Sequence, residues 1–309
     1  MSSKRVQKAK VKRQNKKRIK NAIEIFLLFI VIIVAGYFIY RSLTQPPVVP
    51  LVYTSNLKKE EWMQYIPEDV VHFRVFNFTE INKSHGAELF KNKTVLQFVT
   101  PTFAVKSNDV EWAIEIELSD SSIVNVLSLK HDTLQYVKRT VSSYSLIEGK
   151  YFNVPLYILF SNVSGNIVRS KLAIWNSCII YTEYSDQAIK KILMTALNNI
   201  SSIYHNTDFR VAFQLATNQK SFIVFSLTAF VAMKDLNITW QVSALQQSDS
   251  SLTKFDVYRV QSQEYAINVF YDAKKWLFVK SQKCWITDKF IVAEFAYPIS
   301  DLREVIMEM

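Results

Sequence analysis

The chain has 309 residues, a formal net charge of +10 and only four glycines. Phosphate-binding loops and the nucleophile turns of common serine hydrolases need glycine where the backbone turns tightly or approaches a ligand. None of those motifs occurs in this sequence. The composition therefore argues against a nucleotide-binding enzyme and against the common serine hydrolases.

The excess positive charge lies at the N-terminus. Ten Lys and Arg residues and no acid precede residue 24, whereas the residues after 41 carry 26 bases and 26 acids. No aromatic residue is interleaved with the bases for stacking on nucleotides, so we expect no nucleic-acid partner. We expect segment 1–21 to be a basic cytoplasmic tail that sets topology and contacts anionic lipid headgroups, at about 1 kcal/mol per cation. The bases nearest the following apolar run are Lys12, Arg13, Lys16, Lys17, Arg18 and Lys20.

An apolar run covers residues 22–40, in which Glu24 is the only charged residue. As a helix it would be ~28 Å long, close to the ~30 Å hydrocarbon core of a bilayer. The basic flank places the N-terminus in the cytoplasm and the remainder outside it. The long apolar run without a small-residue cleavage site favours an uncleaved signal-anchor over a signal peptide. We therefore expect a single-pass protein of the cell membrane with the lipid bilayer as one partner.

Residues 41–65 are expected to form a proline-containing spacer and a short helix at 57–65. Beyond them the pattern is mostly strands. The clearest alternation of apolar and polar residues covers 110–118 and is followed by a turn at 119–122. Other expected strands are at 71–75, where His72 and Arg74 alternate with apolar residues, and at 123–129, 144–149, 155–160, 167–175 and 178–184, the last two joined by a tight hairpin at Asn176-Ser177. Helices are expected at 86–99, from 132, from 185 and at the C-terminus.

Two stretches of the chain resemble each other. A short apolar segment precedes Trp112, which is followed by Ser119-Asp120-Ser121-Ser122; a similar segment precedes Trp240, which is followed by Ser248-Asp249-Ser250-Ser251. Self-similarity of this kind predicts a duplicated unit, here at 66–204 and 205–309, with the two copies packed together. The expected fold class is α+β: one N-terminal transmembrane helix, then a duplicated, mainly antiparallel β-rich ectodomain with a few amphipathic helices.

Two segments carry a resemblance to a known group. Ile-Pro-Glu-Asp-Val-Val at 66–71 and Asn206-Thr-Asp-Phe-Arg210 resemble segments of uncharacterised prokaryotic membrane-anchored ectodomains built from strand-rich repeats. The likeness covers most of residues 60–309. Because that family has no established activity, the resemblance implies the architecture and nothing about chemistry.

Candidate catalytic residues are few. Glu111, Glu115 and Glu117 alternate along one expected strand, and carboxylates on one face can serve acid–base catalysis. The same spacing equally describes a solvated strand face, which is the interpretation we favour. The four histidines are scattered and do not cluster with the two cysteines, so we expect no metal site and no cofactor. Cys178 and Cys284 lie in strand-like runs; a disulfide between them is left open, and free thiols are favoured.

Several Asn-x-Ser/Thr sequons follow the apolar run. If the host glycosylates proteins outside the cytoplasm, the candidate acceptors are Asn77, Asn82, Asn92, Asn162 and Asn237. Asn199 is also in a sequon, but its place near the end of an apolar-striped helix makes it a doubtful acceptor.

The function that the sequence favours is a non-enzymatic, membrane-anchored binding or scaffold protein of the cell envelope, whose partner is an envelope protein or surface ligand. Two alternatives remain. One is an envelope hydrolase that uses carboxylates such as Glu111 or Glu115. The other is a sensor that acts through the basic tail.

Overall fold

The computed structural model describes residues 23, 25–40, 48–50, 60–84, 105–144, 146–163, 166–183, 185–218, 220–229, 238–248, 251–273 and 280–309. The chain divides into two compact units, residues 1–46 and residues 47–309. The predicted helix at 86–99 and the basic segment 1–21 lie outside the described residues.

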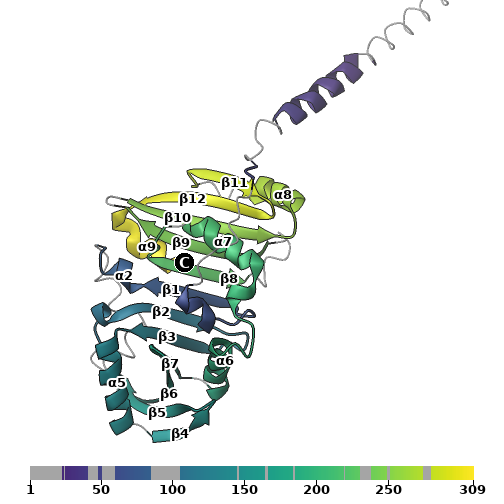
Figure 1. The fold of residues 1–309 in the computed structure, drawn as a ribbon. Helices are drawn as coiled ribbons and strands as arrows, with labels where there is room; N and C mark the ends of the chain where they lie inside the picture. Colours follow the sequence, from purple (N-terminus) through teal and green to yellow (C-terminus); the bar gives the residue numbers. More distant parts are fainter. Residues whose placement is uncertain are drawn as a thin grey trace, which may run out of the picture. The chain divides into compact units, whose positions relative to one another are not determined.

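One twelve-stranded antiparallel sheet organises residues 47–309 (Figure 1). The strand order is β11-β12-β10-β9-β8-β1-β2-β3-β7-β6-β5-β4. The strands are β1 (His72–Asn77), β2 (Val110–Glu117), β3 (Ile123–Leu129), β4 (Leu146–Tyr151), β5 (Val154–Val163), β6 (Asn166–Trp175), β7 (Cys178–Thr182), β8 (Val224–Ala229), β9 (Ile238–Gln247), β10 (Ser251–Val260), β11 (Lys283–Thr287) and β12 (Phe290–Pro298).

The two halves of the sheet meet where β1 pairs with β8, and each half repeats one order of strands outward from that pair. In one half β1, β2 and β3 are followed by β7 and β6; in the other β8, β9 and β10 are followed by β12 and β11. A helix follows the third strand of each half: α5 (His131–Tyr144) follows β3, and α8 (Gln263–Ala273) follows β10. The halves therefore share one continuous sheet through the β1–β8 pair.

One face of the sheet, called the α7 face, is covered by η1 (Glu61–Tyr65), α6 (Asp186–Ala196) and α7 (Thr207–Thr217). Its core includes the alternate strand residues Phe73, Val75, Phe225 and Leu227. Side chains of a strand point alternately to the two faces, so the residues between them belong to the opposite face.

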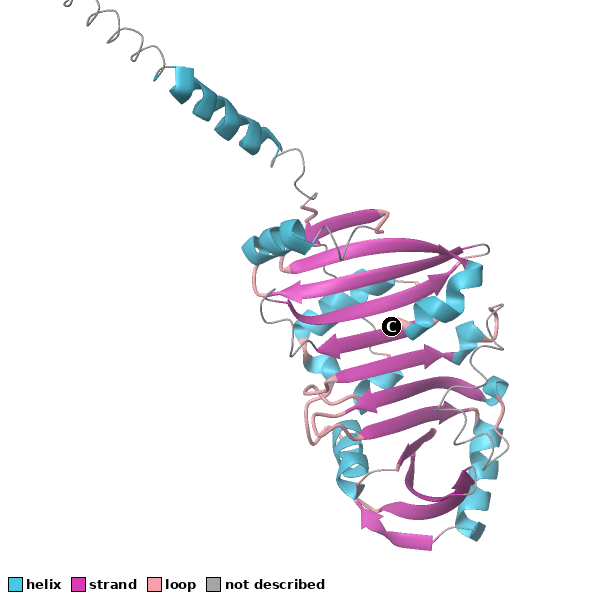
Figure 2. Ribbon diagram, turned by 180° about the vertical axis from the view of Figure 1, so that it is seen from behind, coloured by secondary structure: helices cyan, strands magenta, loops and turns pink. Residues whose placement is uncertain are grey.

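The opposite face, called the α5 face, carries α2 (Phe78–Ile81), α5, α8 and α9 (Leu302–Met307). Leu134, Val137 and Val141 of α5 pack on Leu127 and Leu129 of β3. Figure 2 shows α2, α5 and α9 along one side of this face, with the middle strands in the foreground. The apolar core formed with α2, α5 and α9 thus lies at one side of the α5 face, beside its middle strands.

Several local predictions are confirmed. The alternating run at 110–118 is β2, and Asn176-Ser177 joins β6 to β7. Asn176 has a φ of 52°, a left-handed conformation that asparagine tolerates better than most residues and that tight hairpins require. The predicted helix at 57–65 is, in its described part, the 3-10 helix η1.

The predicted fold class is wrong in its transmembrane helix: among the residues that the structure describes, no helix combines the length and the apolar character needed to cross a membrane. The β1–β8 pair joins all twelve strands, those of both predicted units, into one antiparallel sheet. The division at residues 204 and 205 stays a prediction.

Candidate functional site

A line of polar residues crosses seven adjacent strands on the α5 face. The strand register places Arg74 of β1 opposite both Glu115 and Ser226, and continues through Ser243 to Asp256 on β10. On the other side Glu115 lies opposite Asn125, which lies opposite Tyr181 of β7. With strands ~4.8 Å apart, this line is ~29 Å long. We call it the polar row; its members are Tyr181, Asn125, Glu115, Arg74, Ser226, Ser243 and Asp256.

Local sequence explains why these residues point to the α5 face. In most of these strands the polar residue lies between two apolar neighbours that belong to the α7 core, as in Phe73-Arg74-Val75 and Phe225-Ser226-Leu227. Burying the apolar neighbours forces the residue between them to the other face. The polar row is therefore a direct consequence of packing the aromatic and aliphatic residues under η1, α6 and α7.

One end of the polar row is a buried ion pair. The Asp256 carboxylate is 3.2 Å from Lys254 Nζ and accepts a hydrogen bond of 2.6 Å from Ser243 Oγ. Gln241 Nε2 in turn donates to Ser243 Oγ over 3.0 Å. Lys254 and Asp256 are only 7% and 3% exposed, so their mutual neutralisation is what makes burial of both charges tolerable.

The centre of the polar row is the ion pair between Arg74 and Glu115, whose side chains are 25% and 18% exposed. Two buried polar atoms at this centre make no hydrogen bond: Arg74 Nε and Asn125 Oδ1. Leaving a buried polar group unsatisfied costs about 1–3 kcal/mol. Such groups are uncommon in regions selected only for stability.

A second line of polar side chains runs beside the polar row. His72 lies opposite Glu117 and Thr228, and its Nδ1 is 2.9 Å from Thr228 Oγ1. Burial, and then the charge of Arg74, lowers the pKa of His72 below its ordinary value of 6.5. His72 is accordingly neutral near pH 7.

The tyrosines of this face stay protonated. Burial, followed by the negative charge of Asp256, raises the pKa of Tyr258. Burial, followed by the charge of Glu115, raises the pKa of Tyr181. Phenols held neutral beside paired charges suit hydrogen bonding rather than proton transfer.

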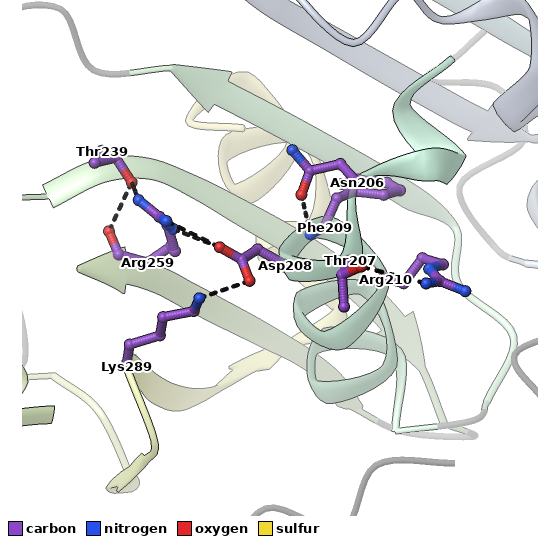
Figure 3. A network of polar contacts seen from close by, with 8 residues as sticks. All are labelled: Asn206, Thr207, Asp208, Phe209, Arg210, Thr239, Arg259 and Lys289. Carbon is purple, nitrogen blue, oxygen red and sulfur yellow. Dashed lines mark hydrogen bonds and ion pairs between the residues drawn. The ribbon is translucent and has the colours of Figure 1, made fainter. Parts of the chain in front are cut away.

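A separate polar network fastens α7 to the other face of the sheet (Figure 3). Asp208 lies 2.7 Å from Lys289 Nζ and 2.9 Å from Arg259 Nη2, and Arg259 also donates to Thr239 Oγ1 over 3.1 Å. Asn206 begins the helix, because its side-chain oxygen accepts from the Phe209 backbone N–H over 3.0 Å. The segment at 206–210, on which part of the family resemblance rests, therefore holds α7 against the sheet. We call the ion pairs of Asp208 with Lys289 and Arg259 the α7 clamp.

Burial alone would raise the pKa of Asp208, but the hydrogen bonds and charges of Lys289 and Arg259 outweigh burial and lower the pKa below its ordinary value of 3.8. Asp208 is thus an ionised carboxylate between two cations. This arrangement stabilises the docking of α7 and leaves the carboxylate a poor general base.

The three glutamates Glu111, Glu115 and Glu117, predicted to share one strand face, do not do so. A register shift between Val110 and Trp112 leaves Glu111 without a cross-strand partner. Its Oε2 accepts a hydrogen bond of 3.1 Å from Ser128, a residue that alternates with Val126 of the α7 core. Only Glu115 and Glu117 remain on the α5 face, and Glu115 is paired with Arg74. The single-face prediction is wrong because of this bulge.

The predicted modification sites fall into three groups. Asn77 caps α2 by accepting from the Glu80 backbone N–H, and Asn82 Nδ2 donates to the Ser107 carbonyl, so both side chains are engaged. Asn199 is exposed after α6. Asn92, Asn237 and the side chain of Asn162 lie outside the described residues, as do Lys12, Arg13, Lys16, Lys17, Arg18 and Lys20. Glycosylation and lipid contact stay predictions.

Cys178 and Cys284 do not form a disulfide, and Cys178 is buried. Burial raises the pKa of the Cys178 thiol to about 12, which makes it a poor nucleophile. Within the described ranges no group of three His, Cys, Asp or Glu side chains is placed to hold a metal ion.

Sequence reasoning missed most of the polar row. It found the alternation of His72 and Arg74 in β1 but not Ser226, Ser243 or Asp256. The available signal was a single polar residue between two apolar ones in β1, β8, β9 and β10. Their alignment depends on pairing between strands that are distant in sequence.

No protein family and no curated protein matches the chain. The structure is similar to solved structures of TP0453. Crystal form III has a TM-score of 0.48 at 7% identity over 83% of this chain and 100% of that chain. Crystal form I has a TM-score of 0.45 at 8% identity over 82% of this chain and 98% of that chain. A likeness this distant defines neither a family nor an activity.

Proposed function

We propose that the protein is a non-enzymatic binding or scaffold protein of the cell envelope whose partner-binding surface is the partly exposed part of the α5 face around Arg74 and Glu115. The observation that carries this proposal is the Arg74–Glu115 ion pair, whose side chains are 25% and 18% exposed in the middle of the polar row. A partner that approaches this face can donate hydrogen bonds to the Glu115 carboxylate and accept them from the Arg74 guanidinium.

The charges of the polar row favour binding over catalysis. Arg74 is paired with Glu115 and Lys254 with Asp256, so each carboxylate already has a cationic partner. A general base or nucleophile needs a poised pKa and an unoccupied lone pair. The partner we propose is an envelope protein that adds hydrogen bonds across the middle strands.

Location at the membrane surface, with residues 47–309 outside the cytoplasm, is part of the proposal. It is supported by the concentration of cations before residue 24 and by the balanced charge after residue 41. A polybasic segment binds anionic lipid with about 1 kcal/mol per cation. Changing Lys12, Arg13, Lys16, Lys17, Arg18 and Lys20 to Gln should weaken binding to phosphatidylserine vesicles. Unchanged binding would contradict lipid contact by these residues.

The binding surface is tested by placing a photo-crosslinking amino acid at Thr228 or Gln241, both half-buried on the α5 face. In living cells we expect one discrete crosslinked protein from each position. The matched control is Gln187, which is exposed on α6 over the other face. Absence of any crosslink at Thr228 and Gln241, or the same products from Gln187, would overturn the proposal. Turnover that Glu115→Gln abolished without unfolding would favour a hydrolase instead.

A further inference from the structure

The turn between β4 and β5 holds a phenylalanine in a backbone conformation that this residue disfavours. Tyr151 lies opposite Val154, so Phe152 and Asn153 form a two-residue turn, in which their φ angles are 47° and 64°. Positive φ at both central residues is the pattern of type I′ hairpins, which favour Asn, Asp or Gly because bulkier side chains are strained there. Asn153 fits this preference, whereas the turn geometry does not account for Phe152.

Phe152 is also exposed to solvent. Its side chain is 49% exposed, and its ring contacts only the edge of the hairpin through Tyr151, at a centroid distance of 4.5 Å. Exposure alone means little, since Phe160 of β5 is 60% exposed in a strand conformation that suits phenylalanine. Phe152 combines exposure with backbone strain at an outer edge of the sheet (Figure 1). Neither core packing nor local geometry therefore explains this residue.

Two lysines flank the turn and form no ion pair with any described residue. Lys150 is exposed directly before Tyr151, and Lys190 Nζ of α6 lies 5.5 Å from the centre of the Tyr151 ring. Consecutive strand residues point to opposite faces, so one lysine lies on each face of the hairpin. The neighbouring carboxylate, Glu148, is already shared by two cations of β6. The surroundings of the turn thus have excess positive charge.

Size and charge favour a lipid surface over a protein as the partner of this turn. Two aromatic side chains bury about 300–500 Å² when both are fully covered. That area is well below the ~800 Å² that each partner buries in a standard protein interface. An exposed aromatic ring between lysines suits an anionic bilayer, because the ring can enter the boundary of headgroups and acyl chains while the ammonium groups stay at the headgroups.

We propose that the β4–β5 turn binds the surface of an anionic lipid bilayer. Phe152 enters the boundary between headgroups and acyl chains, and Lys150 and Lys190 contact the anionic headgroups. This contact is separate from the α5-face surface and from the basic segment 1–21, so it can fail while both of those proposals stand.

The binding test uses residues 47–309, so that the basic segment cannot bind the lipid. This compact unit contains all twelve strands and the three apolar clusters of the core. Its co-sedimentation is measured with phosphatidylcholine vesicles that contain or lack phosphatidylserine. Binding should be at least about tenfold tighter with phosphatidylserine, because each lysine near the surface contributes about fivefold. No binding to phosphatidylserine vesicles, or equal binding to both kinds, would overturn the proposal.

A variant at the turn separates lipid binding from stability. Phe152→Asn should weaken binding to phosphatidylserine vesicles at least about tenfold, because it removes the inserted ring. It should also raise Tm, because asparagine tolerates positive φ better than phenylalanine does. Phe160→Asn is the matched control at an exposed phenylalanine elsewhere on β5 and should leave binding unchanged. Unchanged binding in Phe152→Asn, or an equal loss in Phe160→Asn, would refute the proposal.

The lysines are tested in the same assay. Lys150→Gln and Lys190→Gln should each weaken binding about fivefold, whereas Lys130→Gln, at an exposed lysine before α5, should not change it. Equal effects of all three changes would contradict a site at the turn.

The full-length protein distinguishes a lipid from a protein partner in cells. With a photo-crosslinking amino acid at Asn153, which is exposed, we expect adducts of lipid. A discrete protein adduct from this position would assign the turn to a protein partner and overturn the proposal.

Discussion

The two faces of the central strands are stabilised by different kinds of interaction. On the α7 face, Phe225 of β8 packs among the rings of Trp62, Phe73, Phe209 and Phe213, with centroid distances of 5.0–6.1 Å. On the α5 face, the next residue, Ser226, belongs to the polar row. The same backbone thus carries a core stabilised by buried apolar area and a face stabilised by matched polar partners. The first should be insensitive to pH, and the second should depend on both members of each pair.

The largest effect on stability is expected from removing a ring of the aromatic cluster around Phe225 on the α7 face. Phe225→Ala removes a fully buried ring and should lower the free energy of unfolding by about 3–5 kcal/mol. Phe160→Ala, at a phenylalanine that is 60% exposed, is the matched control and should change it by less than about 0.5 kcal/mol. Urea unfolding monitored by circular dichroism measures both. Equal losses in the two variants would show that the cluster around Phe225 is not the core of this face.

The next largest effect is expected at the buried end of the polar row. Asp256→Ala leaves Lys254 buried without its counter-charge and should cost about 3 kcal/mol in urea unfolding. The double variant Asp256→Leu with Lys254→Met removes both charges and should recover at least half of that loss. If the double variant were as unstable as Asp256→Ala, the loss would come from packing and not from an unpaired charge.

The α7 clamp should show a smaller and pH-dependent effect. Because the folded pKa of Asp208 is lowered, its contribution is complete above the ordinary value of 3.8 and is lost as the pH falls through the folded pKa. Asp208→Asn should therefore lower the free energy of unfolding by about 1–2 kcal/mol at pH 7. The difference in unfolding free energy between variant and wild type should disappear at acidic pH. Asp288→Asn, at an exposed aspartate with a φ of 49°, is the control. A gap of constant size down to low pH would contradict the role of the ion pairs.

How far the sequence predicts this molecule depends on how local each feature is. The strand at 110–118 and the Asn176-Ser177 hairpin follow from alternation and from one residue that tolerates positive φ. The pairing of β1 with β8 could not be predicted in the same way, since His72 and Thr228 are 156 residues apart. The bulge that separates Glu111 from Glu115 was missed because alternation alone assumes an unbroken register.

The candidate sites show the same limit. Every member of the polar row is an ordinary residue in its own strand, and its significance comes from the residue opposite it on the next strand. A pocket of about 430 Å³ combines residues of α2, the connection from α7 to β8, β9 and β10 that no motif connects. The apolar run at 22–40 predicted a membrane span from hydropathy alone, whereas no helix among the described residues is long and apolar enough to be one.

The smallest expected effect concerns His72, beside the centre of the polar row. Its folded pKa lies below 6.5, since burial and Arg74 disfavour the imidazolium more than Glu115 and Glu117 favour it. The unfolded chain therefore binds the proton more readily than the folded chain does. The contribution of neutral His72 to the free energy of unfolding is thus fully present above about pH 6.5 and decreases as the pH falls toward the folded pKa. His72→Gln should flatten this part of the stability curve, and His131→Gln, at an exposed histidine, should leave it unchanged. An unchanged slope between pH 7 and about pH 5.5 in His72→Gln would show that the α5 face does not hold this histidine neutral.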